Sequence, residues 1–395
     1  MRILTFTTLF PSRERPDFGV FIFQRASHLA RRPAHVVHVV APVPYFPHWI
    51  PSQRWGIYGR IPSKETVGNL NVYHPRYFLL PGLLMPLHGL LLFLGSFLLV
   101  RRLHKQLKFE CIDAHYVYPD GFAAVLLGKL LRLPVIVSAR GTDINVFPSL
   151  VMIRPQIVWA LRHAAGVIAV STALRDAMIR LGLPAERVCV IPNGVDGERF
   201  LPFVQAEARR KLGLPLHGKI ILSVGSLTPG KNHRLLITSF GKISSRNSDE
   251  RLYILGAGPL RSQLEELIRE LHLAEKVSLV GARPNEELAL WYSSADLSCL
   301  VSSREGWPNV LMESIACGTP VVATRVGGIP EIITSPDIGV LVEPDPDRIA
   351  AGLEYALQKN WDRHALAQHA KEREWDKVAM DVELYLASSA PASSS

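Results

Sequence analysis

The sequence predicts an α/β protein built from two Rossmann-like, doubly wound domains that face each other across an interdomain cleft. A chain of 395 residues is too long for one ordinary core, because compact domains run to roughly 100–200 residues. Short β-branched runs alternate with amphipathic stretches through both halves, as in βα units around parallel sheets. The polar segment 193–200, with two glycines, is the predicted linker. We therefore expect domains at 1–195 and 196–372, followed by a C-terminal helix and disordered tail at 373–395.

Each predicted strand is a short apolar run bounded by turn residues. In the first half these runs are Ile3–Thr7, His35–Val40, Ile112–His115, Val135–Ser138, Val167–Val170 and Val188–Ile191. In the second half they are Ile220–Val224, Leu252–Leu255, Val277–Val280, Leu297–Leu300, Val321–Ala323 and Val340–Val342. Ligands of such folds bind at the carboxyl ends of the strands. The last helix, around Trp375–Leu386, could belong to either domain.

Cysteine usage and the N-terminus both indicate a cytoplasmic protein. The four cysteines are far apart and show neither zinc-ligand nor disulfide-framework spacing; they are Cys111, Cys189, Cys299 and Cys317. The first residues contain only a short apolar run without a small-residue cleavage site, so we interpret them as a first strand and not as a signal peptide.

The charge is distributed unevenly along the chain. Residues 1–195 contain 22 Lys and Arg against 9 Asp and Glu, a net charge of +13, whereas residues 196–395 contain 22 against 26, a net charge of −4. A basic surface attracts nucleic acid, anionic lipid or a diphosphate-bearing substrate. The chain has no recognisable nucleic-acid-binding motif, so we expect no nucleic-acid partner.

One stretch departs from the βα pattern. Residues Phe78–Val100 are nearly uncharged and lead directly into basic residues, so that 78–105 is a candidate membrane-associating segment. A spanning helix needs roughly 20 apolar residues, and two prolines and a histidine interrupt this run. Three interpretations stay open: a spanning helix, an interfacial helix on the inner face of the cell membrane, and a buried core helix.

The most specific stretch is REGWPNVLMESIACGTPVVATRVGGIPE, residues 304–331. A strand that ends near Val301 leads into a loop, and Pro308 is well placed as the first residue of a helix that runs to about Cys317. The backbone N–H groups at the start of this helix would then be free to bind a diphosphate; they belong to Asn309, Val310 and Leu311.

Two glutamates of this stretch are candidate substrate contacts. Glu313, about one turn into the helix, would accept hydrogen bonds from ribose hydroxyls, and Glu305 in the preceding loop would reach the sugar. The alternative is that both are solvated surface carboxylates. Nothing in the sequence clusters His, Cys, Asp or Glu as metal ligands, so no metal is expected.

This stretch resembles the signature of the retaining glycosyltransferases of family 4, the group 1 glycosyltransferases, which have the GT-B fold. The resemblance covers most of the chain, and it is looser in the N-terminal half. It implies a nucleotide diphosphate sugar as donor, a saccharide or lipid-linked acceptor, and no cofactor. It also implies that Gly306 lies in the donor site and that Glu305 acts in catalysis.

Other positions match the family singly. The segment Ser223–His233 resembles the loop whose lysine, here Lys231, neutralises the departing diphosphate. An arginine often found five residues earlier is Ser226 in this chain, so one cationic donor contact is missing or supplied elsewhere. Arg283 belongs to a loop that resembles the nucleobase-binding loop of the family. The Gly-x-Gly within Leu255–Arg261 is a weak signal by itself, and a structural turn is its expected use.

Four N-terminal residues complete the expected site. Gly19 resembles the glycine that lets a loop approach the donor diphosphate, where a Cβ would obstruct contact. His115 matches a histidine near the reacting sugar, and an acceptor-orienting or core role is equally open. Arg140 and Asp143 end the next strand and are expected to contact acceptor or donor.

The expected function is retaining transfer of a hexose or similar sugar, in the synthesis of envelope polysaccharide or glycolipid. Two alternatives stay open: a sugar-nucleotide epimerase of the same fold, and a catalytically silent scaffold that binds nucleotide sugars or membranes.

Overall fold

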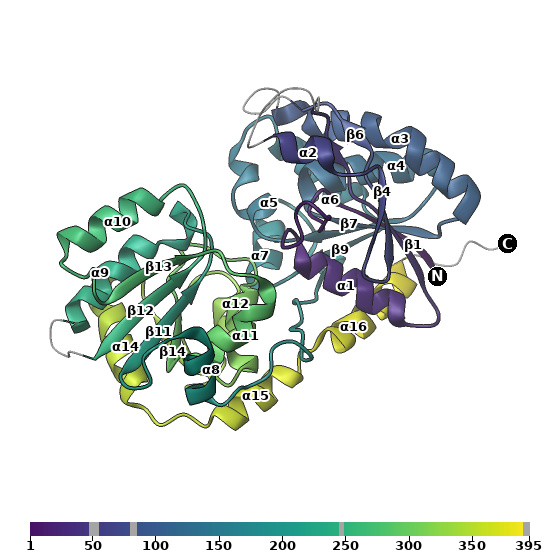
Figure 1. The fold of residues 1–395 in the computed structure, drawn as a ribbon. Helices are drawn as coiled ribbons and strands as arrows, with labels where there is room; N and C mark the ends of the chain where they lie inside the picture. The colour runs from purple at the N-terminus through teal and green to yellow at the C-terminus, as the bar shows by residue number, and fades with distance from the viewer. Residues whose placement is uncertain (47–54, 80–84, 245–248, 390–395) are drawn as a thin grey trace. The chain divides into compact units, whose positions relative to one another are not determined.

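The computed structural model describes residues 1–46, 55–79, 85–244 and 249–389, which form two compact units (Figure 1). The first unit comprises Met1–Asn193 together with Trp375–Ser395, and the second comprises Gly194–Glu374. The chain therefore leaves the first unit once and returns to it with its last helix.

The first unit contains an eight-stranded sheet in the order β10-β9-β8-β7-β1-β2-β5-β4. Its strands are β1 Arg2–Phe6, β2 Val36–Val40, β4 Lys64–Val67, β5 Leu70–Tyr73, β7 Cys111–His115, β8 Val135–Ala139, β9 Gly166–Ala169 and β10 Val188–Val190. All neighbours pair in parallel except β4 and β5. The central strands β7 and β8 are buried at every position because helices cover the sheet. The strand order reverses between β1 and β7, so a ligand site is expected at their carboxyl ends.

The helices of this unit are α1 Val20–Arg31, α2 Gly56–Arg60, α3 His88–Leu107, α4 Phe122–Leu131, α5 Thr142–Asn145, α6 Arg154–His163, α7 Thr172–Arg180 and α16 Trp375–Ser389. Helix α16 packs beside α1 (Figure 1). Trp375, Val378, Val382 and Leu386 recur at helical spacing and are buried in the same core as β1. Each such side chain contributes roughly 1.5–3 kcal/mol by burial, so α16 is part of the first unit's core.

The segment between β2 and α3 holds elements that the apolar-run pattern missed. A small parallel pair, β3 Val43–Pro44 and β6 Arg76–Tyr77, flanks α2 and the β4–β5 hairpin. The hairpin turns at Gly68, whose φ of 57° lies in the left-handed region. The hairpin strands β4 and β5 have four residues each and contain polar residues, and they therefore lack the continuous apolar runs of the central strands.

The second unit contains a six-stranded parallel sheet in the order β13-β12-β11-β14-β15-β16, the order of a doubly wound nucleotide-binding sheet. Its strands are β11 Lys219–Val224, β12 Glu250–Leu255, β13 Val277–Gly281, β14 Leu297–Leu300, β15 Val321–Thr324 and β16 Gly339–Val342. Its helices are α8 Gln205–Leu212, α9 His233–Ser244, α10 Arg261–Glu270, α11 Asn285–Ser294, α12 Asn309–Ala316, α13 Ile329–Ile332, α14 Pro346–Gln358 and α15 Arg363–Lys371. Together the two sheets confirm the predicted α/β fold, and every strand predicted from an apolar run is present.

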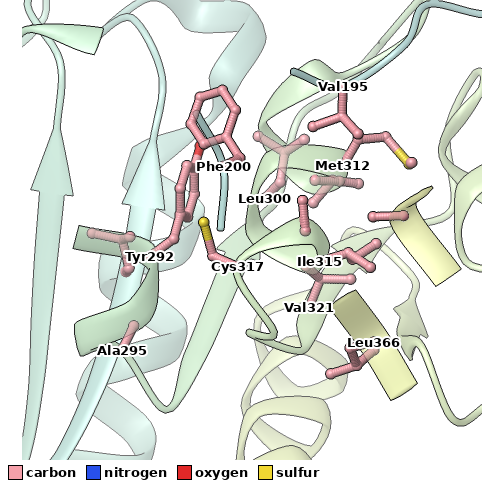
Figure 2. Close-up of a cluster of buried hydrophobic side chains, with 14 of the residues drawn as sticks. Val195, Phe200, Tyr292, Ala295, Leu300, Met312, Ile315, Cys317, Val321 and Leu366 are labelled. Atoms are coloured by element: carbon pink, nitrogen blue, oxygen red, sulfur yellow. The ribbon is translucent and has the colours of Figure 1, made fainter. Parts of the chain in front are cut away.

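One core of the second unit fixes α12 against the sheet (Figure 2). Leu311, Met312 and Ile315 are buried on one face of the helix. Tyr292 of α11 is fully buried beside Phe200, with ring centroids 6.1 Å apart. Because interiors are close-packed, this shared core fixes the position of α12 in the unit.

Among the residues that the structure describes, one helix is long and apolar enough to cross a membrane, judged by length and composition alone. It runs from Met85 to Leu107, has a mean hydropathy of 1.4 in its most apolar window, and has 28% of that window buried. The buried share is too small for an ordinary core helix, although one face does pack on the unit.

Candidate active site

The strand order of the second unit reverses between β11 and β14, and two predicted site residues meet at that point. Lys231 ends a short 3-10 turn after β11, and Glu305 lies in the loop after β14. The Lys231 Nζ donates to Glu305 Oε1 at 2.5 Å, and their side chains are 25% and 12% exposed. Adjacent loops are joined where the Ser303 N–H donates to the Gly230 carbonyl at 2.9 Å. The fold therefore brings a cation and a carboxylate together where doubly wound sheets bind ligands.

A third loop fixes the backbone of Glu305. Gly327 follows β15 with a φ of +53°, and a Cβ there would lie 1.9 Å from the Glu305 carbonyl oxygen. Gly256 after β12 similarly packs against the Gly225 carbonyl, where a Cβ would come within 1.9 Å. These glycines serve close backbone packing. The Gly-x-Gly segment is thus a structural turn, as its weak sequence signal indicated.

Helix α12 begins one residue later than predicted. Pro308 has an extended ψ of 97° and precedes the helix as its N-cap, so the interpretation of Pro308 as the first helical residue was wrong. The Leu311 N–H donates to the Pro308 carbonyl at 3.1 Å and is therefore not free for a ligand. The partial positive charge of the helix end still lies on the backbone around Asn309 and Val310. Gly306 is buried in the loop just before this end.

Glu313 lies on α12 within the same unit, held by a residue that the sequence did not reveal. The Tyr292 hydroxyl donates to Glu313 Oε2 at 2.9 Å. Burial raises the pKa of Glu313 to about 7, against the stabilising effects of this hydrogen bond and of Arg199. The pairing spans two helices and 21 positions, and no local pattern marks it. Glu313 is thus half-buried and held by the Tyr292 hydroxyl, and it is not a freely solvated surface carboxylate.

Two further positions that the sequence analysis linked to donor binding are exposed. Arg283 follows β13 and is solvent-exposed, two residues after Gly281 with its φ of +89°. Ser226, which occupies the place of the family's arginine, is also exposed, and its hydroxyl lies 3.3 Å from that of Thr228.

In the first unit, Gly19 is the N-cap residue that precedes α1, in the loop that follows β1. Its φ is 71°, and a Cβ would lie 2.3 Å from the Leu9 carbonyl oxygen. The glycine is therefore required by the loop's own packing, a reason that holds whether or not a ligand approaches it.

His115 ends β7 in a buried network of charges. Its Nε2 lies 3.3 Å from Asp113 Oδ2, and its Nδ1 contacts the Arg140 guanidinium. Asp113 in turn binds the buried Arg25 of α1 at 3.0 Å. Burial lowers the pKa of His115 to about 3, opposed by Asp113 and assisted by Arg140. The imidazole is therefore neutral near pH 7, and its ring orientation is set by its charged neighbours.

Arg140 and Asp143 also belong to this region, with different surroundings. Asp143 is fully buried and accepts the N–H groups of Val117, Arg140 and Gly141 at 2.8, 3.1 and 2.7 Å. Its carboxylate therefore holds the loop after β8 together. Arg140 donates to Asn193 at 2.7 Å as well as contacting His115.

A cavity that sequence reasoning missed opens beside the β1 loop of the first unit. It has a volume of about 160 Å³, and aromatic rings and one guanidinium line it, including those of Phe18, Trp55, Tyr58 and Arg15. The Arg15 guanidinium stacks 3.5 Å from the centroid of Phe18 and donates to the Tyr58 hydroxyl at 3.1 Å. The density of aromatic residues and prolines between 42 and 58 is the only signal that could have indicated it.

A buried carboxylate adjoins this cavity. Thr8 lines the cavity and donates its N–H to Asp120 at 2.6 Å and its hydroxyl at 3.0 Å. Burial raises the pKa of Asp120 to about 7, partly offset by these hydrogen bonds.

Two doubly wound units in one chain are the architecture of the GT-B fold, and the class of enzyme follows from two family models. Residues 204–373 match the model of glycosyl transferases group 1, and residues 19–199 match that of glycosyltransferase family 4. The two models together cover most of the chain, which belongs to the group 1 glycosyltransferases of family 4.

Relatives of known name agree with this assignment. The chain is 27% identical over 271 residues to N-acetyl-alpha-D-glucosaminyl L-malate synthase of Bacillus anthracis, covering 68% of this chain and 70% of that protein. It is 35% identical over 239 residues to a D-inositol 3-phosphate glycosyltransferase of Corynebacterium urealyticum, covering 56% of each.

Solved structures share the fold across nearly the whole chain. Sucrose-phosphate synthase from Thermosynechococcus elongatus superposes with a TM-score of 0.78 at 20% identity, over 97% of this chain and 98% of that one. Anabaena HepE in complex with UDP-glucose superposes with a TM-score of 0.71 at 19% identity, over 98% and 100% of the two chains.

Proposed function

We propose that this chain is a retaining glycosyltransferase that moves a hexose or similar sugar from a nucleotide diphosphate donor to a saccharide or lipid-linked acceptor. The observation that carries the proposal is the Lys231–Glu305 pair at the switch point of the second unit's sheet. A related structure contains UDP-glucose, so uridine diphosphate sugars are the first donors to test.

In this proposal the second unit binds the donor. Lys231 and the N-terminus of α12 neutralise the diphosphate, whose charge grows as the glycosidic bond breaks. Glu305, 2.5 Å from the Lys231 ammonium, then lies beside the sugar that adjoins the diphosphate. Glu313, oriented by Tyr292, accepts the ribose hydroxyls, and Arg283 lies at the nucleobase. Lys231 and the helix end take the place of a metal ion.

The proposed chemistry is same-face attack. The acceptor oxygen bonds to the anomeric carbon as the bond to the diphosphate oxygen breaks, and the departing phosphate takes the acceptor's proton. This course retains the anomeric configuration and needs no protein nucleophile. The resemblance to family 4 supports it.

The first unit would serve the acceptor and the transferred sugar. Gly19 and His115 flank the carboxyl ends of β1 and β7, the switch point of this unit's sheet. The aromatic cavity offers flat rings for a sugar face and a guanidinium for an anionic group. Asp143 has a structural part in this scheme, because backbone N–H groups already engage its carboxylate.

A panel of labelled UDP- and GDP-sugars, incubated with the purified protein with and without lipid extract, tests this proposal. Acceptor-dependent release of nucleotide with an α-linked product from an α-linked donor supports it. An epimerised donor would indicate an epimerase, and binding without turnover would indicate a scaffold. Tyr58→Ala at the cavity should raise the KM for acceptor and leave the KM for donor unchanged.

A further inference from the structure

Helix α3 of the first unit has two apolar faces with different environments. One face, with Leu92, Val100 and Leu103, is buried in the unit. The opposite face carries three leucines that stay in solvent, and Leu87 in the turn just before α3 continues their helical spacing: Leu87 is 43% exposed, Leu90 43%, Leu94 57% and Leu98 74%. An ordinary surface helix would place polar side chains along this face, so the exposed leucine row requires a partner.

The buried face is fixed to the unit by two glycines. A Cβ on Gly89 would lie 2.6 Å from the Phe122 ring of α4, and a Cβ on Gly95 would lie 2.6 Å from the Tyr77 Cβ of β6. These close contacts need glycine and would be lost if α3 left the unit to cross a bilayer. The helix is therefore held in place with its leucine row outward.

A second apolar element lies beside the start of this helix. Leu150, Val151 and Met152 are consecutive and 40%, 84% and 69% exposed. The Gln156 side-chain amide donates to the carbonyls of both Pro86 and Met152, at 2.8 and 3.0 Å. The Gln156 side chain thus joins the loop before α6 to the turn before α3. The exposed apolar surface therefore has two parts, the leucine row and residues 150–152.

Basic residues follow the exposed leucines toward the C-terminal end of α3. Exposed basic residues follow Leu98 along the C-terminal part of α3: Arg101, Arg102, Lys105 and Lys108. No acidic residue occurs between Lys64 and Glu110 other than Glu65, and residues 1–195 carry 22 basic against 9 acidic side chains. A second copy of the chain would bring the same positive charge to this face, whereas anionic lipid headgroups complement it.

We propose that the first unit docks on an anionic membrane surface through this face, with the leucine row of α3 and the 150–152 loop among the acyl chains and the basic end of α3 at the headgroups. The proposal goes beyond sugar transfer, and vesicle binding tests it without turnover. A helix that lies in the interface with one apolar face buried is the geometry of a peripheral protein. Docking would bring an acceptor dissolved in the bilayer to this unit.

The expected effects follow from burial and charge. Each leucine removed from the acyl layer lowers binding on the order of tenfold, and each basic residue removed lowers it about fivefold at low salt. Higher salt weakens the electrostatic part and leaves the apolar part. Binding should therefore fall, but not vanish, as salt rises.

Sedimentation of the full chain with phosphatidylcholine vesicles, with and without phosphatidylglycerol, tests the proposal. We expect binding to the anionic vesicles, a loss of about a hundredfold in Leu94→Gln/Leu98→Gln, and a smaller, salt-sensitive loss in Arg101→Gln/Lys105→Gln. Leu384→Gln, at a 69% exposed leucine of α16, is the matched control and should bind normally. Circular dichroism shows that each variant is folded.

Three outcomes would overturn the proposal. Protein that stays in the supernatant with anionic vesicles at low salt does not dock. Protein that resists extraction by carbonate spans the bilayer. A dimer in light scattering that the leucine variants abolish, without vesicle binding, assigns the face to a second copy. Release of nucleotide from the donor is independent of all three, so failure here leaves the proposed activity untouched.

Discussion

Replacement of Lys231 by methionine should weaken binding of UDP and slow sugar transfer by a larger factor. Methionine keeps the length and apolar stem of lysine and removes only the ammonium, which lies 2.5 Å from Glu305. The donor diphosphate is charged before the reaction and gains charge as the glycosidic bond breaks. In the proposed role, the ammonium therefore stabilises the transition state more than the bound donor.

The structure sets the size of both effects. A hydrogen bond to a charged group contributes about 1.5–3 kcal/mol, and the 25% exposure of Lys231 places it toward the lower end. At about 1.4 kcal/mol per tenfold, the Kd for UDP should rise roughly tenfold. Loss of one preorganised donor to developing charge costs on the order of a hundredfold or more in kcat.

Glu305→Gln should not weaken UDP binding, in contrast to Lys231→Met. The substitution removes a negative charge next to the diphosphate position, so UDP should bind equally well or more tightly. Transfer should still fall, on the order of a hundredfold, if Glu305 contacts the sugar. The double variant should lose less transfer activity than the sum of the two single losses, expressed as free energies, because both side chains belong to one ion pair.

Calorimetry with UDP and a transfer assay with labelled UDP-sugar measure the two quantities. Lys242→Met, at an exposed lysine of α9 in the same unit, is the control and should behave as the native chain. An unchanged Kd for UDP in Lys231→Met, or an equal loss in the control, refutes the donor-site assignment.

Three further predictions concern single residues. His115→Ala should leave the Kd for UDP nearly intact and lower transfer by about a hundredfold; normal turnover would remove His115 from the site. Burial raises the pKa of Glu313 to about 7, so if ribose hydroxyls donate to its ionised form, as proposed, UDP affinity should increase from pH 6 to pH 8. Glu313→Gln should flatten this dependence. Gly327→Ala, where a Cβ would lie 1.9 Å from the Glu305 carbonyl, should lower the thermal midpoint or the UDP affinity. Gly241→Ala in α9, where a Cβ would meet only Leu273 at 3.4 Å, should not, and equal behaviour of the two variants contradicts the packing argument.

The parallel strands of both sheets could be predicted because their signal is local. A strand covered on both faces is mostly apolar and ends at turn residues, and β7 and β8 are buried at every position. The β4–β5 hairpin could not be predicted this way, because its short strands contain polar residues and form no continuous apolar run. Likewise, the sequence left α16 between two domains, and its packing against α1 depends on a contact between the two ends of the chain.

For the candidate site, the sequence by itself determined which residue types follow which strands: a lysine after β11, a glutamate after β14 and a second glutamate in the helix that follows. Only the tertiary structure decided their partners. Lys231 meets Glu305 across 74 positions because β11 and β14 are neighbours in the sheet, and Tyr292 binds Glu313 because α11 and α12 share one core. Local sequence patterns predict burial and turns, since these depend on adjacent residues. Pairings between loops depend on strand order, which is set by the packing of the whole sheet.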